Sequence, residues 1–214
     1  MEPFHVEQLR RVLVDGLAQL GVPADPTDLE RFEKLALLLD RWGQRINLSG
    51  HHGAIQIAER LLLEAAALSR VLPPAGTLVD LGSGAGIPGL PLAICWPHCT
   101  VRLVESRERR HHFQRAAIRE LGLDNAIALL GRAEDIAVSP AEGVIAQAIA
   151  QPEQALDWMR RWVATAGWIA LPTVPGTAPS HPELLPGQVL RYAAPHGPER
   201  AVWIARLRES DPSA

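Results

Sequence analysis

The chain has 214 residues, of which 47% are hydrophobic, and a formal net charge of -3. This is enough for one substantial hydrophobic core, and no run of 18 apolar residues suggests a membrane span. Charges spread through the first twenty residues argue against a signal peptide, and the net charge excludes a globally basic RNA-binding surface. We therefore expect a cytoplasmic monomer without a membrane partner, in which any contact with RNA is local.

Helical periodicity dominates the first third of the chain. Apolar residues recur at helical spacing over 6–20, and Thr27 to Glu30 form the pattern of a capping box that opens a second helix. The residues that this helix is expected to bury are Leu29, Phe32, Leu35, Leu38, Leu39 and Trp42. A third helical stretch, roughly 54–71, ends at a proline pair. We therefore expect an N-terminal helical extension over 1–71 and a compact core over 72–214.

Strands alternate with helices in the rest of the chain. Five strands are predicted, over 77–81, 100–104, 126–130, 143–146 and 167–171, followed by an antiparallel edge pair near 188–192 and 201–207. Such alternation is typical of an α/β fold with a mostly parallel sheet and helices on both faces. The only cysteines, Cys95 and Cys99, are expected within one of these helices, and no metal site is expected because no companion ligand pair follows them.

The first predicted strand runs into a glycine-dense turn. The stretch is Asp80-Leu81-Gly82-Ser83-Gly84-Ala85-Gly86-Ile87-Pro88-Gly89, with Pro88 suited to the first turn of the next helix. Glycines allow a sharp turn and a close approach of the backbone to a ligand. Because open α/β sheets bind ligands at the ends of their strands, the turn predicts a nucleotide-cofactor site.

Two cofactors compete for this turn. Gly84 to Gly89 match the G-x-G-x-x-G dinucleotide pattern, which suggests NAD. However, Gly82 directly follows the strand, and counted from Gly82 the third glycine position is Ile87. An acidic residue before the turn, Asp80, fits S-adenosylmethionine, which carries an ammonium and a sulfonium charge. Glu105, at the end of the next strand, lies where a carboxylate accepts hydrogen bonds from ribose hydroxyls in both cofactor classes. S-adenosyl-L-methionine is therefore favoured.

The whole chain resembles the glucose-inhibited division protein B family, the RsmG type of 16S rRNA guanine-N7 methyltransferase. The resemblance rests on the glycine turn extended to Leu92, and on the segments Trp42-Gly43-Gln44-Arg45-Ile46-Asn47-Leu48-Ser49, Glu105-Ser106 followed by Arg109-Arg110, and Arg132-Ala133-Glu134-Asp135. It implies a class I methyltransferase fold with a Rossmann-like sheet and 16S rRNA or the small ribosomal subunit as partner.

The turn and the resemblance together predict the site. The expected cofactor-binding residues are Asp80, Gly82, Ser83, Gly84, Gly86, Ile87, Glu105, Ser106, Ala133, Glu134 and Gln147. The expected RNA-side residues are Asn47, Arg60, Arg107, Arg109, Arg110 and Arg132, for which a solvated helix face is the alternative. No catalytic base is expected, because guanine N7 carries a lone pair and no proton.

Three positions depart from the family pattern on the substrate side. Leu61 replaces a histidine, Gln147 replaces an arginine, and Pro172 replaces a lysine. Two alternatives therefore stay open beside the rRNA methyltransferase. One is a relative that methylates another RNA or a small molecule, and the other is a cofactor-binding protein without catalytic activity.

Overall fold

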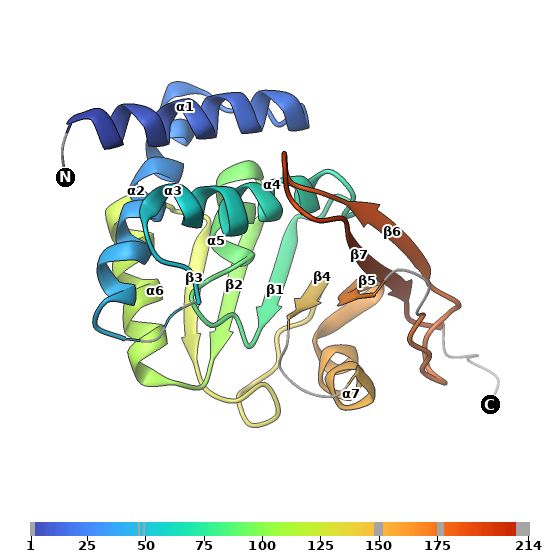
Figure 1. The fold of residues 1–214 in the computed structure, drawn as a ribbon. Coiled ribbons are helices and arrows are strands. Elements are labelled where there is room, and N and C mark those ends of the chain that lie inside the picture. Colours follow the sequence, from blue (N-terminus) through green and yellow to red (C-terminus); the bar gives the residue numbers. More distant parts are fainter. Residues whose placement is uncertain (1–2, 47, 49, 148–151, 175–177, 209–214) are drawn as a thin grey trace.

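The computed structural model describes residues 3–46, 48, 50–147, 152–174 and 178–208. Its centre is a seven-stranded sheet of order β3-β2-β1-β4-β5-β7-β6 (Figure 1). The strands are β1 Thr77–Leu81, β2 Thr100–Glu105, β3 Ala126–Leu130, β4 Ala141–Ala146, β5 Val163–Thr173, β6 Gln188–Tyr192 and β7 Arg200–Arg206. The first five strands run parallel, and β7 is antiparallel to both β5 and β6. The predicted fold class, with its antiparallel edge pair, is confirmed.

Two strands start clearly earlier than predicted, β4 by two residues at Ala141 and β5 by four. β5 begins at Val163, whereas the sequence pattern predicts a start at Gly167. The ladder between β4 and β5 is irregular here: Ala141 pairs with Val163, and regular pairing resumes with Gly143 and Trp168. The predicted start therefore coincides with the regular part of the ladder, because alternation of side chains is lost across the irregular segment.

Helices cover both faces of the sheet. They are α1 Pro3–Leu20, α2 Pro26–Gly43, α3 Ala54–Ile57, the π-helical turn η1 Ala58–Leu62, α4 Leu63–Ser69, α5 Gly89–Cys95, α6 Glu108–Leu121 and α7 Pro152–Trp162. Alternate residues of a strand face opposite sides, so Leu78 of β1 joins a core with α1 to α6, while Val79 joins another with α7. Figure 1 shows α7 apart from the other helices.

Four local predictions at helices are wrong. The N-cap of α2 is Asp25, whose Oδ1 accepts the Asp28 N–H at 2.8 Å, and not Thr27, because a proline at the first helical position favours this start. Trp42 packs edge-on against Phe113 of α6 but also lines a surface cavity, so it is half-buried and not fully buried. Pro88 is the N-cap of α5, because the glycine turn takes up more residues than expected, and Cys99 lies beyond the end of α5, because Pro97 follows the C-cap and cannot continue the helix. In contrast, the third helical stretch is present over 54–69, with η1 as a π-helical turn within it.

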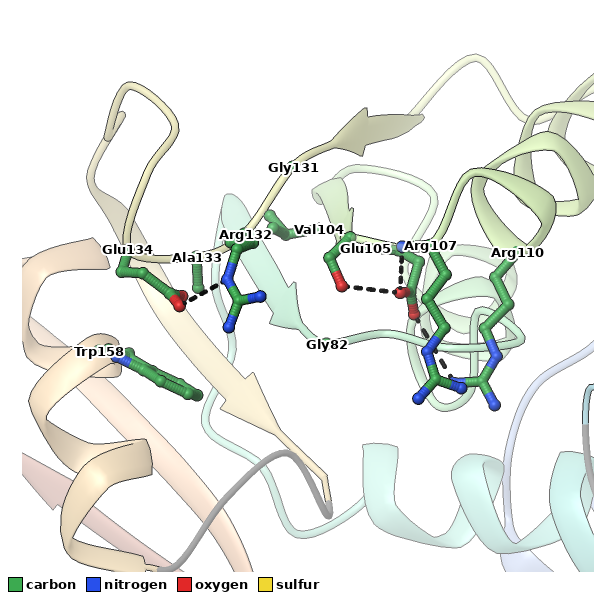
Figure 2. A pocket seen from close by; sticks show the side chains of 11 residues that line it. Gly82, Val104, Glu105, Arg107, Arg110, Gly131, Arg132, Ala133, Glu134 and Trp158 are labelled. Atoms are coloured by element: carbon green, nitrogen blue, oxygen red, sulfur yellow. Dashed lines mark hydrogen bonds and ion pairs between the residues drawn. The ribbon is translucent and has the colours of Figure 1, made fainter.

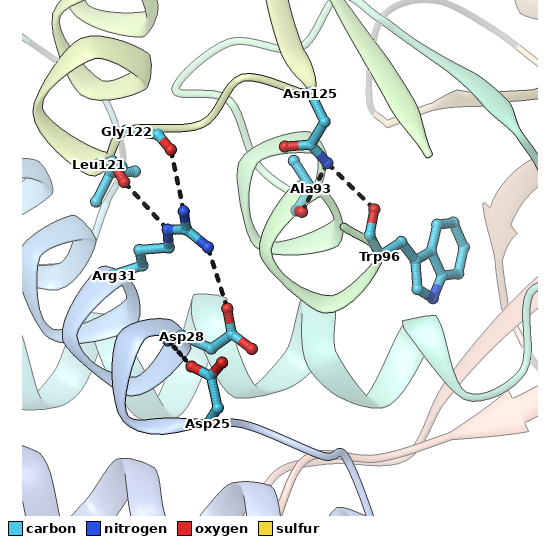
Figure 3. A network of polar contacts seen from close by, with 8 residues as sticks. All are labelled: Asp25, Asp28, Arg31, Ala93, Trp96, Leu121, Gly122 and Asn125. Carbon is cyan, nitrogen blue, oxygen red and sulfur yellow. Dashed lines mark hydrogen bonds and ion pairs between the residues drawn. The ribbon is translucent and has the colours of Figure 1, made fainter. Parts of the chain in front are cut away.

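The N-terminal helices are tied to the core by polar contacts as well as by packing. Arg31 of α2 donates to the carbonyls of Leu121 and Gly122 at the end of α6, at 3.1 and 3.0 Å (Figure 3). Asn125 similarly joins the loop before β3 to the end of α5. One apolar cluster runs through α1, α2, α4, α5 and α6. The division at residue 71 stays a prediction.

Candidate active site

The turn after β1 brings a carboxylate under the start of the next helix. Asp80 is fully buried, and its Oδ2 accepts the Gly89 N–H at 2.9 Å. Burial raises the pKa of Asp80 to about 7, because a charge is poorly solvated there. A side chain on Gly89 would run into Leu103 and Asp80, so only glycine fits at this contact. In this conformation Asp80 anchors the turn and does not line a cavity.

Glu105 is fixed at the end of β2 by hydrogen bonds to both carboxylate oxygens. Its Oε1 accepts from the backbone N–H of Arg107 at 2.8 Å, and its Oε2 accepts from that of Gly84 at 2.9 Å. Gly84 adopts a left-handed φ of 56°, which favours glycine. Arg110 Nη1 lies 4.0 Å from Oε2, and the Glu105 side chain is 5% exposed. The carboxylate is thus oriented before any ligand arrives.

A cavity of about 510 Å³ opens beside this carboxylate, at the ends of β1, β2 and β3. Figure 2 shows Arg107 and Arg110 on one side of it, and Arg132, Glu134 and Trp158 on the other. The predicted residues that line it are Gly82, Glu105, Ser106, Ala133, Glu134, Arg107, Arg110 and Arg132. Together they form a polar cleft with an apolar floor at Ala133.

Three lining residues were missed at the level of sequence: Val104, Gly131 and Trp158. Gly131 directly follows β3, so its place at a strand end was a readable signal. Val104 is an apolar residue of β2, and no sequence feature distinguishes it from the other apolar residues of this strand. Trp158 belongs to α7, between β4 and β5, and no local pattern indicated that this helix would turn an aromatic ring toward the cavity.

The loop after β3 is held against α7. Trp162 Nε1 donates to the Ala133 carbonyl and Arg161 Nη1 to the Glu134 carbonyl, each at 3.0 Å. Arg132 Nε donates to Glu134 Oε1 at 2.9 Å, which lowers the pKa of Glu134. These contacts fix the backbone of the segment opposite Glu105.

The remaining predicted residues lie elsewhere. Ser83 and Gly86 are inside the turn, where the Ser83 hydroxyl accepts from Gln114 Nε2 at 2.8 Å. Arg109 is exposed on α6 and lines neither this cavity nor the next. The other three, Ile87, Gln147 and Arg60, line a smaller, second cavity. Asn47 is outside the described residues.

The observed geometry fits S-adenosylmethionine. The cavity has the size of a small-molecule site, and Gly82 leaves the backbone accessible. Glu105 Oε1 accepts from the Arg107 N–H and the Ser106 hydroxyl, whereas Oε2 accepts from the Gly84 N–H and retains a lone pair for a ribose hydroxyl. The parallel sheet places this site at the ends of β1 and β2, where the cofactor of such folds binds. The protein is a class I methyltransferase that depends on S-adenosylmethionine.

Its family follows from comparison with known proteins. Residues 28–172 match the GidB family, rRNA small subunit methyltransferase G, and the chain belongs to this family. It is 34% identical over 157 residues to ribosomal RNA small subunit methyltransferase G of Chromohalobacter salexigens, covering 73% of this chain and 75% of that protein. The protein of the same name from Pasteurella multocida is 35% identical over 153 residues, covering 71% and 72%.

The fold also matches a solved structure. Cofactor-bound Rv0187 from MTB superposes with a TM-score of 0.57 at 18% identity, covering 92% of this chain and 97% of that one. At this identity the likeness concerns the fold. The helices of the described residues include none long and apolar enough to cross a membrane.

Proposed function

We propose that this protein transfers a methyl group from S-adenosylmethionine to N7 of a guanine in 16S rRNA of the small ribosomal subunit. Its family membership supports the RNA substrate. The observation that carries the proposal is the Glu105 carboxylate, held by the Arg107 and Gly84 N–H groups at the edge of a ligand-sized cavity.

The bound cofactor supplies an electrophilic methyl group on a sulfonium. Glu105 would accept hydrogen bonds from the ribose, while Ala133 and Trp158 would provide apolar contacts for the adenine. Guanine N7 attacks with its own lone pair, so the protein must align the base and needs no general base.

Arginines around the cofactor cavity would contact the RNA backbone. Arg107 and Arg110, from the start of α6, face Arg132 across the cavity (Figure 2). Guanidinium groups bind phosphates bidentately. Arg132 also pairs with Glu134, and Arg110 with Glu105, so these two connect the RNA side to the cofactor side. Arg109 is exposed, so a substitution at this position tests RNA contact separately from cofactor binding.

We also propose that the protein acts in the cytoplasm, as a monomer, with the helices of residues 1–71 forming one wall of the substrate cleft. The family supports the location, because small ribosomal subunits are found there. The proposed wall is supported by the position of Arg60 of η1, which lines the second cavity. Light scattering after gel filtration tests the monomer, for which a mass of 23.3 kDa is expected.

Transfer of a labelled methyl group tests the reaction. The acceptors are intact small subunits, deproteinised 16S rRNA, other cellular RNA and a small-molecule extract. We expect label in 16S rRNA, recovered as 7-methylguanosine after nuclease digestion. Label only in another RNA or in a small molecule would overturn the substrate, and cofactor binding without label in any acceptor would overturn the catalytic function.

A further inference from the structure

A second cavity lies beside the cofactor cavity, where the strand order reverses. It has a volume of about 50 Å³, and its lining includes Arg60, Glu64, Ile87, Gln147 and Tyr192. Leu81 of β1 pairs with Ala146 of β4, so the next residues, Gly82 and Gln147, continue neighbouring strands. Gly82 lines the first cavity and Gln147 the second. A substrate atom that reaches the methyl group from this side would therefore sit between the two cavities.

The carboxylate of the second cavity is Glu64, which belongs to α4. Its side chain is 18% exposed, and its Oε2 accepts from Arg200 Nε of β7 at 3.1 Å. A carboxylate offers about four lone-pair sites, so the hydrogen bond from Arg200 leaves accepting capacity on both oxygens. This ion pair ties α4 to the edge pair of the sheet.

The helix that carries this carboxylate has an irregular turn beside the cavity. Arg60 is in the π-helical turn η1, directly before α4, and its side chain is exposed. Such turns are rare and are frequent at functional sites. Arg60 thus adds an exposed cation to a cavity whose lining also holds the Glu64 carboxylate, an arrangement that suits a nucleotide, with donors on its base and a negative phosphate.

We propose that this second cavity receives the Watson–Crick edge of the target guanine and that Glu64 recognises it, an inference that rests on the proposed function. Guanine offers two adjacent donors, N1–H and the N2 amino group, and a carboxylate accepts from both. Adenine presents an acceptor at N1 and is repelled. A volume of about 50 Å³ admits the edge of a base but not the whole base. N7 belongs to another edge and stays open toward the cofactor.

The same carboxylate assists the reaction. Methylation at N7 leaves a positive charge on the purine and makes its N1–H more acidic. The hydrogen bond from N1–H to Glu64 therefore strengthens as the new bond forms, and an interaction that is stronger in the transition state raises the rate. Glu64 then contributes to turnover as well as to the choice of base.

Guanosine and inosine 5′-monophosphates probe the recognition without methyl transfer, since inosine lacks only the N2 amino group. We titrate both by NMR into the protein saturated with the demethylated cofactor. One charge-assisted hydrogen bond corresponds to about 10- to 100-fold in affinity, so we expect that preference for guanosine monophosphate in the wild type. In Glu64→Gln the preference should shrink to a few-fold.

Arg200→Gln is the matched control, because it breaks the same ion pair and keeps the Glu64 carboxylate. It should retain the preference for guanosine monophosphate. Equal affinities of the wild type for both nucleotides, an unchanged preference in Glu64→Gln, or equal losses in both variants would overturn the inference.

Methyl transfer to 16S rRNA by the same proteins separates the inference from the proposed function. We expect kcat/KM to fall about 10- to 100-fold in Glu64→Gln at unchanged affinity for S-adenosylmethionine. If the wild type transfers no methyl group while its nucleotide preference depends on Glu64, the proposed function is wrong and the recognition of guanine stands. Full transfer by Glu64→Gln overturns the inference and leaves the function intact.

Discussion

At the scale of single residues, we expect cofactor binding to depend most on Glu105. Glu105→Gln replaces one acceptor oxygen by an amide that faces the Arg107 or Gly84 N–H. We expect the affinity for S-adenosylmethionine to fall about 10- to 100-fold, because charge-assisted hydrogen bonds contribute about 1.5–3 kcal/mol. Calorimetry measures this, with Glu120→Gln, an exposed carboxylate near the end of α6, as control. Unchanged affinity would mean that the ribose is held elsewhere.

Asp80 predicts how stability depends on pH. Its pKa rises from 3.8 to about 7 on burial, so between these values the folded chain binds more protons than the unfolded one. Its contribution to stability is therefore greatest at low pH, declines as pH rises from about 4 to about 7, and then levels off. A pKa difference of this size corresponds to a change of about 4 kcal/mol in the free energy of unfolding.

Asp80→Asn removes the titration and keeps an oxygen for the Gly89 N–H. Urea unfolding at intervals from pH 4 to pH 8 should show the stability of the variant rising relative to the wild type as pH increases. The exposed Asp124→Asn is the control and should run parallel to the wild type. Parallel profiles for Asp80→Asn as well would contradict the assignment.

At the scale of elements, Arg31 joins the N-terminal helices to the core. Its guanidinium satisfies two carbonyls at the end of α6, where helical carbonyls have no partner within the helix. We expect Arg31→Ala to lower the free energy of unfolding by about 1–3 kcal/mol, since its hydrogen bonds to the two carbonyls and to Asp28 Oδ1 are lost and the part-buried Leu121 carbonyl is left unpaired.

Arg41→Ala is a matched control for this prediction, because Arg41 also connects α2 to α6. Its ion pair with Glu120 is exposed, at 62% and 44% of the two side chains. Such surface pairs contribute about 0–1 kcal/mol. Urea unfolding of both variants measures the two losses in the free energy of unfolding. Equal losses would show that Arg31 acts only as a surface charge.

At the scale of the whole molecule, a net charge of -3 requires that RNA be held by a local group of arginines. We expect RNA affinity to fall steeply with salt, and Arg109→Ala to flatten that dependence by about one phosphate contact while cofactor affinity stays unchanged. Arg119→Ala, exposed at the far end of α6, is the control and should keep the wild-type slope. Wild-type affinity that does not change with salt would exclude the arginines around the cofactor cavity as an RNA-binding surface.

The strands and the cofactor turn were predictable because their signals are local. β1, β3 and β6 begin and end where alternating or continuous apolar residues indicate, and Gly82 and Glu105 lie at strand ends that the sequence marks. Helix starts were less predictable. Asp25 and Thr27 both have the side chain of an N-cap, and the choice between them depends on the whole first turn.

By itself, the sequence determined the order of the elements and the class of cofactor, and it indicated the carboxylate that we propose for the ribose, because each depends on neighbours along the chain. Only the tertiary structure decided that Trp158 of α7 joins the cofactor cavity and that Glu64 lies near Gln147 in the second one. The sheet places β4 beside β1 although β2 and β3 come between them in the chain, so side chains converge in sheet order and not in sequence order.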